Sequence, residues 1–442
     1  MSESEKSNGK LGYWSVVAIG IGGMVGGGIF AVLGLAVQLA RGGTPVAFAI
    51  AGLVALLTSY SYAKLSVTYP SPGGTVEFLN HGLGTGLITG SLNVLLSISY
   101  IIMLSLYAHA FGSYAASFLP HNWQALGSHM LLSGAVVALT VLNILGSRAV
   151  GEAEEWVVGL KLSILVLFVA VGLVSTKYGA MQPHQWTSPL HLVAGGMLIF
   201  LAYEGFELIA NTAQDVQNAE RTLPRAYYSA VTFVILLYVL VSVVAVGNLS
   251  VSELVRAKDY ALAEAARPFM GKMGFILIGI AAMLSTASAI NATLYGATRI
   301  SYIIARDGEL PHFLERKVWR KPIEGLLISA SLTLVVANLF NIESISMMGS
   351  AGFLIVFAAV NITNVIQCRR TRSAWPVSAA GAVACVAALS ALIWIRAAES
   401  PTTLWVLGGM LLLSVSFEAL YRGFTGRRIR PHLPEQSIAR DG

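Results

Sequence analysis

Charged residues are scarce in this sequence. Only 11% of its 442 residues are Asp, Glu, Lys or Arg, whereas soluble domains carry about 25%. Because 55% of the residues are apolar, too few polar side chains remain to cover a water-soluble globule of this length. The composition therefore excludes a soluble protein, and the formal net charge of +6 does not require a nucleic-acid partner.

Cysteine is also rare, and enzyme motifs are missing. Cys368 and Cys385 both lie in or beside apolar stretches, so they predict neither a disulfide framework nor a metal site. No H-E-x-x-H motif, Walker glycine loop or G-x-S-x-G elbow occurs at a plausible site, and the repeated filter loop of an ion channel is not visible. We therefore expect no enzymatic activity, no cofactor and no metal.

Long apolar runs take the place of charged segments. Each is long enough for the roughly 20 residues that a bilayer requires. We predict twelve spans, at residues 12–38, 43–69, 84–118, 129–147, 153–175, 188–213, 225–248, 270–304, 323–340, 344–367, 375–395 and 401–421. Basic residues are concentrated in one alternate set of loops and tails. The positive-inside rule thus predicts a multi-pass protein of the cytoplasmic membrane with both termini cytoplasmic.

The first span contains an unusual glycine cluster, GIGGMVGGGIF, from Gly20 to Phe30. Each glycine costs a helix interior about 1 kcal/mol relative to alanine. Overlapping G-x-x-x-G pairs could mean close helix packing, but the run Gly26, Gly27, Gly28 favours an unwound segment. Its amides, together with the positive end of a helix that restarts at Ile29, could hold a carboxylate.

The sixth span carries two acidic residues in its middle. Glu204 and Glu207 flank Gly205 within residues 195–216, and acidic side chains at that depth indicate function by default. Alternatively, the span is shorter and ends near Tyr203. Against this alternative, an apolar helical triplet resumes after Glu207.

Interruptions in spans one and six occupy matching positions if the first ten spans form two inverted five-helix repeats. We expect the first span to be broken near Gly26–Gly28 and the sixth near Ala202–Gly205. Such a pair indicates the midplane site of a secondary transporter. We therefore divide the chain into a cytoplasmic tail (1–11), a ten-helix transport core (12–367), two accessory helices (375–421) and a second cytoplasmic tail (422–442). The residues favour no particular oligomeric state.

Five motifs, in this order along the chain, resemble the amino acid–polyamine–organocation (APC) superfamily. They are GGMVGGGIF, NILGSRAVGEAE, GLKLSILVLF, FLAYEGFELIANTAQDVQNAERTLPRA and STASAINATLYGATRISYIIARDGELPHFLERKVW. The sequence is most similar to ApcT-type proton-coupled amino-acid permeases, from residue 11 to about residue 340. The resemblance implies the LeuT fold, in agreement with the inverted repeats.

The resemblance also implies a substrate site at the two interruptions. The substrate carboxylate would meet amides of the glycine motif, and its ammonium would meet carbonyls on both interrupted helices, under an aromatic lid. The implied residues are Gly26, Gly27 and Gly28 for the carboxylate, Met24, Leu201, Ala202 and Glu204 for the ammonium, and Phe200 as the lid. ApcT relatives carry an apolar residue where Glu204 stands. Glu204 could therefore contact a cationic substrate, titrate, or face a neighbouring helix.

Lys161 is the only charge past the first turn of the fifth span, where a lysine costs about 2.5–3.5 kcal/mol. It lies five residues after Trp156, about 8 Å along the helix, so snorkelling to the cytoplasmic edge is one interpretation. In ApcT-like proteins a lysine here stands in for the sodium ion of related transporters. The alternative interpretation places its ammonium against Gly22, with Ser285 and Ser288 completing the shell.

We thus expect a transporter that imports amino acids by alternating access, coupled to protons through Lys161. Burial disfavours the charged form of a lysine, so Lys161 could release and take up a proton. His109, Glu204 and Glu207 are alternative proton sites. The expected partners are an amino acid, a proton and the lipid bilayer. An exchanger or a sodium-coupled symporter of the same fold is the alternative function.

Overall fold

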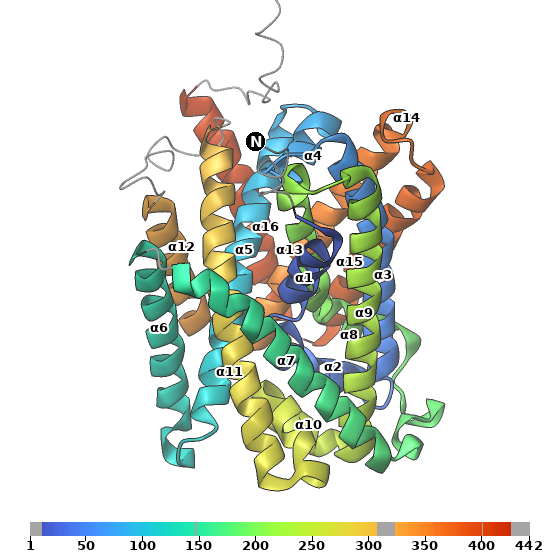
Figure 1. Cartoon of the computed structure of the whole chain (residues 1–442), viewed down its shortest axis with the longest axis vertical. Helices are drawn as coiled ribbons and strands as arrows, with labels where there is room; N and C mark the ends of the chain where they lie inside the picture. Colours follow the sequence, from blue (N-terminus) through green and yellow to red (C-terminus); the bar gives the residue numbers. More distant parts are fainter. Residues whose placement is uncertain (1–10, 146–147, 307–322, 400, 426–442) are drawn as a thin grey trace, which may run out of the picture.

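The computed structural model describes residues 11–145, 148–306, 323–399 and 401–425. Throughout these ranges the chain forms helices joined by short loops, and the only β-pairing in them consists of two isolated bridges. Figure 1 shows most helices running along one direction, with α4 and α14 at one end of the bundle and α10 at the other. This is the layout of a helical membrane protein, in which backbone polar groups are satisfied within each span.

The helices follow one another in a simple order. Their bounds are α1 (Tyr13–Met24), α2 (Gly28–Ala40), α3 (Thr44–Thr68), α4 (Thr75–Leu83), α5 (Leu87–Ala116), α6 (His121–Leu145), α7 (Arg148–Ser175), η2 (Tyr178–Met181), η3 (Pro183–Gln185), α8 (Pro189–Leu198), η4 (Phe200–Asp215), α9 (Ala219–Asn248), α10 (Val251–Ala257), η5 (Lys258–Tyr260), α11 (Ala261–Arg306), α12 (Ile323–Leu339), α13 (Ile342–Ile366), α14 (Cys368–Thr371), α15 (Trp375–Glu399) and α16 (Pro401–Thr425).

Nine helical segments in the described ranges are long and apolar enough to cross a membrane. Two further pairs qualify when each is taken as one bent span: α1 with α2, bent by 47°, and α8 with η4, bent by 48°. The apolar helix α12 has only 17 residues. Each of the twelve predicted ranges overlaps one of these elements, but length and composition support nine to eleven spans. The chain is a polytopic helical membrane protein.

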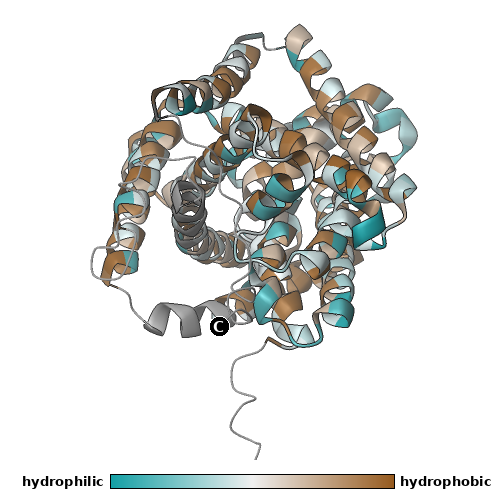
Figure 2. Cartoon of the chain, turned by 90° about the horizontal axis from the view of Figure 1, so that it is seen from above, coloured by the Kyte–Doolittle hydropathy of each residue, from teal (hydrophilic) through white to brown (hydrophobic). Residues whose placement is uncertain are grey.

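Burial separates inner from outer helices. In α13, 89% of the apolar 18-residue segment is buried within the protein, against 22% of the corresponding segments of α6 and α16. Large apolar side chains such as Met130, Val383 and Leu412 face outward from α6, α15 and α16. Seen from above, apolar stretches run along helices at the rim of the bundle (Figure 2). These outer surfaces suit contact with lipid tails, and α13 belongs to the core.

The two bent spans pack against each other at the centre. A Cβ atom at Gly205 would lie 2.2 Å from the carbonyl carbon of Gly23. One at Gly20 would lie 2.7 Å from Cδ1 of Ile209. Only glycine permits such an approach. The glycine cluster therefore provides close packing at its start and an unwound segment at its end, so both interpretations of the motif hold for different glycines.

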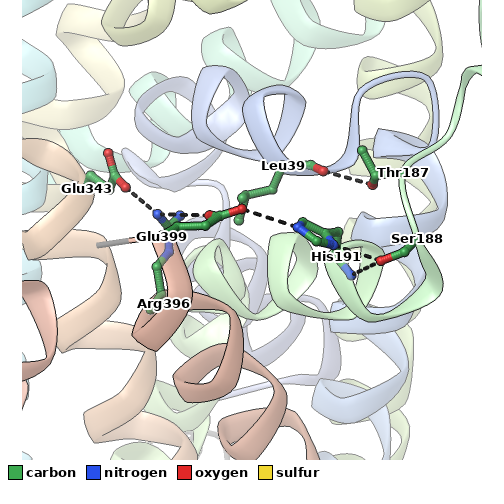
Figure 3. A network of polar contacts seen from close by, with 7 residues as sticks. All are labelled: Leu39, Thr187, Ser188, His191, Glu343, Arg396 and Glu399. Carbon is green, nitrogen blue, oxygen red and sulfur yellow. Dashed lines mark hydrogen bonds and ion pairs between the residues drawn. The ribbon is translucent and has the colours of Figure 1, made fainter. Parts of the chain in front are cut away.

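A polar network joins the ends of three helices away from these breaks (Figure 3). Arg396 at the end of α15 forms an ion pair with Glu343 at the start of α13 and lies 3.9 Å from Glu399. His191 in α8 reaches Glu399 at 3.2 Å. Lys258 of η5 pairs with Glu343 at 3.4 Å.

Two further hydrogen bonds extend this network toward α2. The Thr187 hydroxyl donates to the carbonyl oxygen of Leu39 at 2.8 Å, and the Ser188 hydroxyl lies 2.7 Å from Nδ1 of His191. The network thus links the end of α2 and the start of α8, which belong to the two bent spans, to the core helix α13.

Candidate functional site at the two helix breaks

The first break lies between α1 and α2. Helix α1 ends at Met24 and α2 begins at Gly28, one residue earlier than the predicted restart at Ile29. The unwound residues are therefore 25–27. From α11, the Ser285 hydroxyl donates to the carbonyl oxygen of Val25 at 3.1 Å and is also hydrogen-bonded to that of Gly26. This serine satisfies carbonyl groups that a helix end leaves without partners.

The second break lies at Ile199, where α8 gives way to η4. We predicted this break at Ala202–Gly205, and the prediction was three residues too late. The reason is a pair of serines on α13. Ser346 and Ser350 donate to the carbonyl oxygen of Leu198 at 2.5 and 3.0 Å, and the amide of Leu201 donates to Ser350 at 3.1 Å. The backbone groups that lose their helical partners at the end of α8 are thus hydrogen-bonded by side chains of α13.

Beyond the second break the chain is wound as a long 3₁₀-helix, from Phe200 to Asp215. Runs of this kind longer than three or four residues are uncommon and often mark hinges or strain. Glu204 and Gly205 therefore lie inside a tightly wound helix and not at the break itself. The winding brings Gly205 directly against Gly23 of α1.

Tyr238 of α9 connects the two breaks. Its hydroxyl lies 2.7 Å from the carbonyl oxygen of Met24 and 3.4 Å from that of Ala202. Both carbonyls were expected to receive a substrate ammonium. We did not identify Tyr238 from the sequence, although a tyrosine within an otherwise apolar run is a signal that could have been used.

The glycines of the first break are tightly enclosed. A Cβ atom at Gly27 would lie 2.3 Å from Cδ1 of Tyr107 and 2.9 Å from Cγ2 of Thr286. One at Gly28 would lie 2.7 Å from the Cα atom of Ala202. Any side chain at these positions would displace α5, α11 or η4. Tyr107 and Thr286 are also residues that sequence reasoning missed.

A cavity of about 610 Å³ extends from the start of α1 toward the breaks. Its wall comes from α1, α5, α7, α11 and η4, and its volume suits a small molecule. Among the expected site residues, Gly22, Ser288 and Glu204 line it. Another group is buried and lies outside this wall: Met24, Gly26, Gly27, Gly28, Phe200, Leu201 and Ala202. The structure thus brings the predicted residues together around the breaks, but only some of them line the cavity.

Lys161 of α7 is directed toward α1. The residue is 1% exposed, and its Nζ donates to the carbonyl oxygen of Gly22 at 3.2 Å. A snorkelling lysine would keep its charged head in water. Lys161 instead lies in the protein interior, behind a glycine that lines the cavity.

The two acids of η4 have different surroundings. Glu207 is hydrogen-bonded by the hydroxyls of Tyr100, Tyr62 and Thr75, the last two at 3.3 and 3.5 Å. Glu204 is equally buried, yet its Oε2 has no hydrogen-bond partner in the described ranges. His109, another alternative proton site, is partly buried in α5 and lies outside the wall of the cavity.

Comparison with known proteins gives a consistent family. A family model described as amino acid permease matches residues 11–415. The chain is 38% identical to an uncharacterized protein of Methanocaldococcus jannaschii, over 82% of this chain and 83% of that protein. It is 34% identical to the inner membrane transport protein YbaT of Escherichia coli, with 93% and 96% covered. The branched-chain amino acid permease BcaP of Bacillus subtilis is 24% identical, with 81% and 80% covered.

The matched region contains both bent spans, the cavity and Lys161. It also includes α15 and most of α16. The relatives are permeases and transporters in the cases where their names state a function. The chain therefore belongs to the amino acid permease family of the APC superfamily, and it is a membrane transporter of amino acids or related compounds, not an enzyme.

Proposed function

We propose that this protein imports amino acids across the cytoplasmic membrane by proton symport and alternating access. Its transport core would comprise residues 12–367, arranged as two inverted five-helix repeats of the LeuT type. Residues 375–421 would be the accessory helices of a twelve-span protein, with the tails 1–11 and 422–442 in the cytoplasm. The two bent spans support this arrangement because matching interruptions indicate the binding site of such transporters.

In this proposal the substrate backbone binds at the two breaks. Its carboxylate would accept hydrogen bonds from the amides of Gly26, Gly27 and Gly28, where the positive end of the α2 dipole also points. Its ammonium would be held by the carbonyls of Met24 and Ala202, exchanging with the Tyr238 hydroxyl that contacts both. The backbone carbonyls of Leu201 and Glu204 would be further acceptors for the ammonium, and Phe200 would cover the site.

One observation carries the coupling proposal: the buried contact of Lys161 Nζ with the carbonyl oxygen of Gly22. A charged ammonium donates a strong hydrogen bond and would hold α7 against α1. A neutral amine would hold it less firmly. Ser285 already joins α11 to the first break, and Ser288 lines the cavity nearby. Protonation of Lys161 would therefore bias the packing of α1, α7 and α11, which is a local charge change acting on a two-state element.

The test is uptake into proteoliposomes. Purified protein is given labelled amino acids with an inward proton gradient, with an inward sodium gradient, or with an internal amino acid and no gradient. We expect accumulation above equilibrium only with the proton gradient. Accumulation driven by sodium alone, or exchange that requires an internal counter-substrate, would contradict proton symport and favour the sodium symporter or the exchanger. Absence of uptake for every amino acid would contradict amino-acid transport itself.

A further inference from the structure

Glu204 is a buried carboxylate that the proposed coupling mechanism does not use. It is 1% exposed, and its Oε2 has no hydrogen-bond partner among the residues described. Leaving a buried acceptor unsatisfied is costly, and more so for a charged group. Glu207, one turn later, is satisfied by three hydroxyls. Of the two acids in η4, Glu207 thus accepts hydrogen bonds from residues of α3, α4 and α5, whereas Oε2 of Glu204 accepts none among the residues described.

Glu204 lies close to the first break. Two neighbours in η4 touch the helices on either side of the unwound residues: Ala202 packs against Gly28 of α2, and Gly205 packs against Gly23 of α1. Glu204 stands between these two contacts in the chain and lines the cavity. Its side chain therefore lies beside the place where the amino-acid backbone would bind.

The wall of the cavity has a simple charge pattern. Among the described residues that line it, Glu204 is the only one whose side chain is an acid or a base. The other wall residues near it include the aromatic rings of Tyr100 and Tyr107, whose faces attract cations. Lys161 approaches Gly22 from α7 and does not line the cavity. A cavity lined by one carboxyl group and two tyrosines suits a positively charged ligand.

We propose that the Glu204 carboxylate binds a cationic group on the substrate side chain, so that the substrates are amino acids with a side-chain ammonium or guanidinium. This inference rests on the proposed function, because it places the substrate backbone at the two breaks. The incoming ammonium or guanidinium donates to the Glu204 carboxylate. A substrate of the same shape without that donor leaves the carboxylate unsatisfied and therefore binds more weakly.

The test compares matched ligands on the full-length protein. Binding and proton-driven uptake are measured for lysine against norleucine and for arginine against citrulline, because each pair differs chiefly in side-chain charge. We expect wild type to favour the cationic member by about tenfold or more, as for hydrogen bonds to charged groups. In Glu204→Gln and Glu204→Met this preference falls to about one. The matched control Glu207→Gln alters an acid outside the cavity wall and keeps the lysine-to-norleucine ratio.

The outcomes separate this inference from the proposed function. Wild type that transports norleucine as well as lysine contradicts the role of Glu204, yet leaves proton-coupled amino-acid import intact. The role of Glu204 is also contradicted if both Glu204 variants keep the wild-type preference for lysine over norleucine, whether or not they keep proton coupling. Wild type that takes up none of the four ligands, nor any other amino acid, contradicts the proposed function. Thermal midpoints of the variants in detergent verify that they are folded.

Discussion

Gly27 illustrates how a single residue constrains the first break. Its missing side chain leaves space that the Tyr107 ring and the Thr286 methyl group fill. The sequence predicted the unwound glycines because several glycines in one span weaken a helix locally. The sequence did not predict the enclosing side chains, since they come from helices more than 70 residues away. Lys161 and Gly22 could be paired from the sequence only because a family resemblance supplied the contact.

Replacing Gly27 by alanine should impair substrate binding. The added Cβ atom would lie 2.3 Å from the Tyr107 ring, so the break or α5 must shift. Overpacking of this kind costs about 1–3 kcal/mol. The matched control is Gly134→Ala in α6, where a Cβ atom meets nothing within 4 Å and alanine favours the helix. Equilibrium binding of labelled amino acid and thermal midpoints would be measured; equal affinities in the two variants would contradict the assignment of Gly27.

At the scale of elements, the two breaks differ in what determines them. The first depends on local glycines, and its predicted position was wrong by one residue at the restart of α2. The second depends on hydrogen bonds from Ser346 and Ser350 to Leu198, across about 150 residues of chain. Sequence periodicity carries no information about such pairings. For this reason the sixth-span break could be predicted to exist, from its buried acids, but not placed.

The serine contacts predict a measurable effect on the second break. Ser350→Ala would leave the Leu201 amide without its acceptor and remove one donor from the Leu198 carbonyl. A buried group left without a partner costs about 1–3 kcal/mol. We expect a lower thermal midpoint and weaker substrate binding. Ser390→Ala serves as the control, because Ser390 is exposed and bonds within its own helix. Ser350→Ala behaving like Ser390→Ala in both assays would show that α13 does not stabilise this break.

At the scale of the whole molecule, composition and apolar runs were sufficient to predict a polytopic helical membrane protein. They placed all twelve predicted ranges on helices, with α12 shorter than a full span. The polar network around Arg396 could not be predicted, because only the fold brings together its members from α8, α13 and α15 (Figure 3). Lys258 of η5 joins it through Glu343. This network connects α2 and α8, one helix from each bent span, with the core helix α13.

Loss of the Glu343 carboxylate should destabilise the protein more than loss of the Glu399 carboxylate. The Arg396 side chain is 2% exposed, Glu343 is 16% exposed and Glu399 is 38% exposed. Breaking a buried pair costs about 3–5 kcal/mol, whereas an exposed pair contributes about 0–1 kcal/mol. Thermal midpoints of Glu343→Gln and Glu399→Gln would be compared. The double variant Glu343→Gln/Arg396→Met should recover part of the loss; equal midpoints for the two single variants would contradict this ranking.

The central claim is that Lys161 couples protons to transport, and proton-driven uptake tests it most directly. Wild type, Lys161→Ala, Lys161→Arg and the control Lys177→Ala are reconstituted, and accumulation of labelled amino acid is measured under an inward proton gradient. Lys177 is an exposed loop residue, so its variant should accumulate substrate like wild type. Lys161→Ala removes the amine proposed to carry the proton, and arginine does not deprotonate in proteins; both should bind amino acid without concentrating it. If both Lys161 variants still concentrate substrate, Lys161 is not the coupling residue.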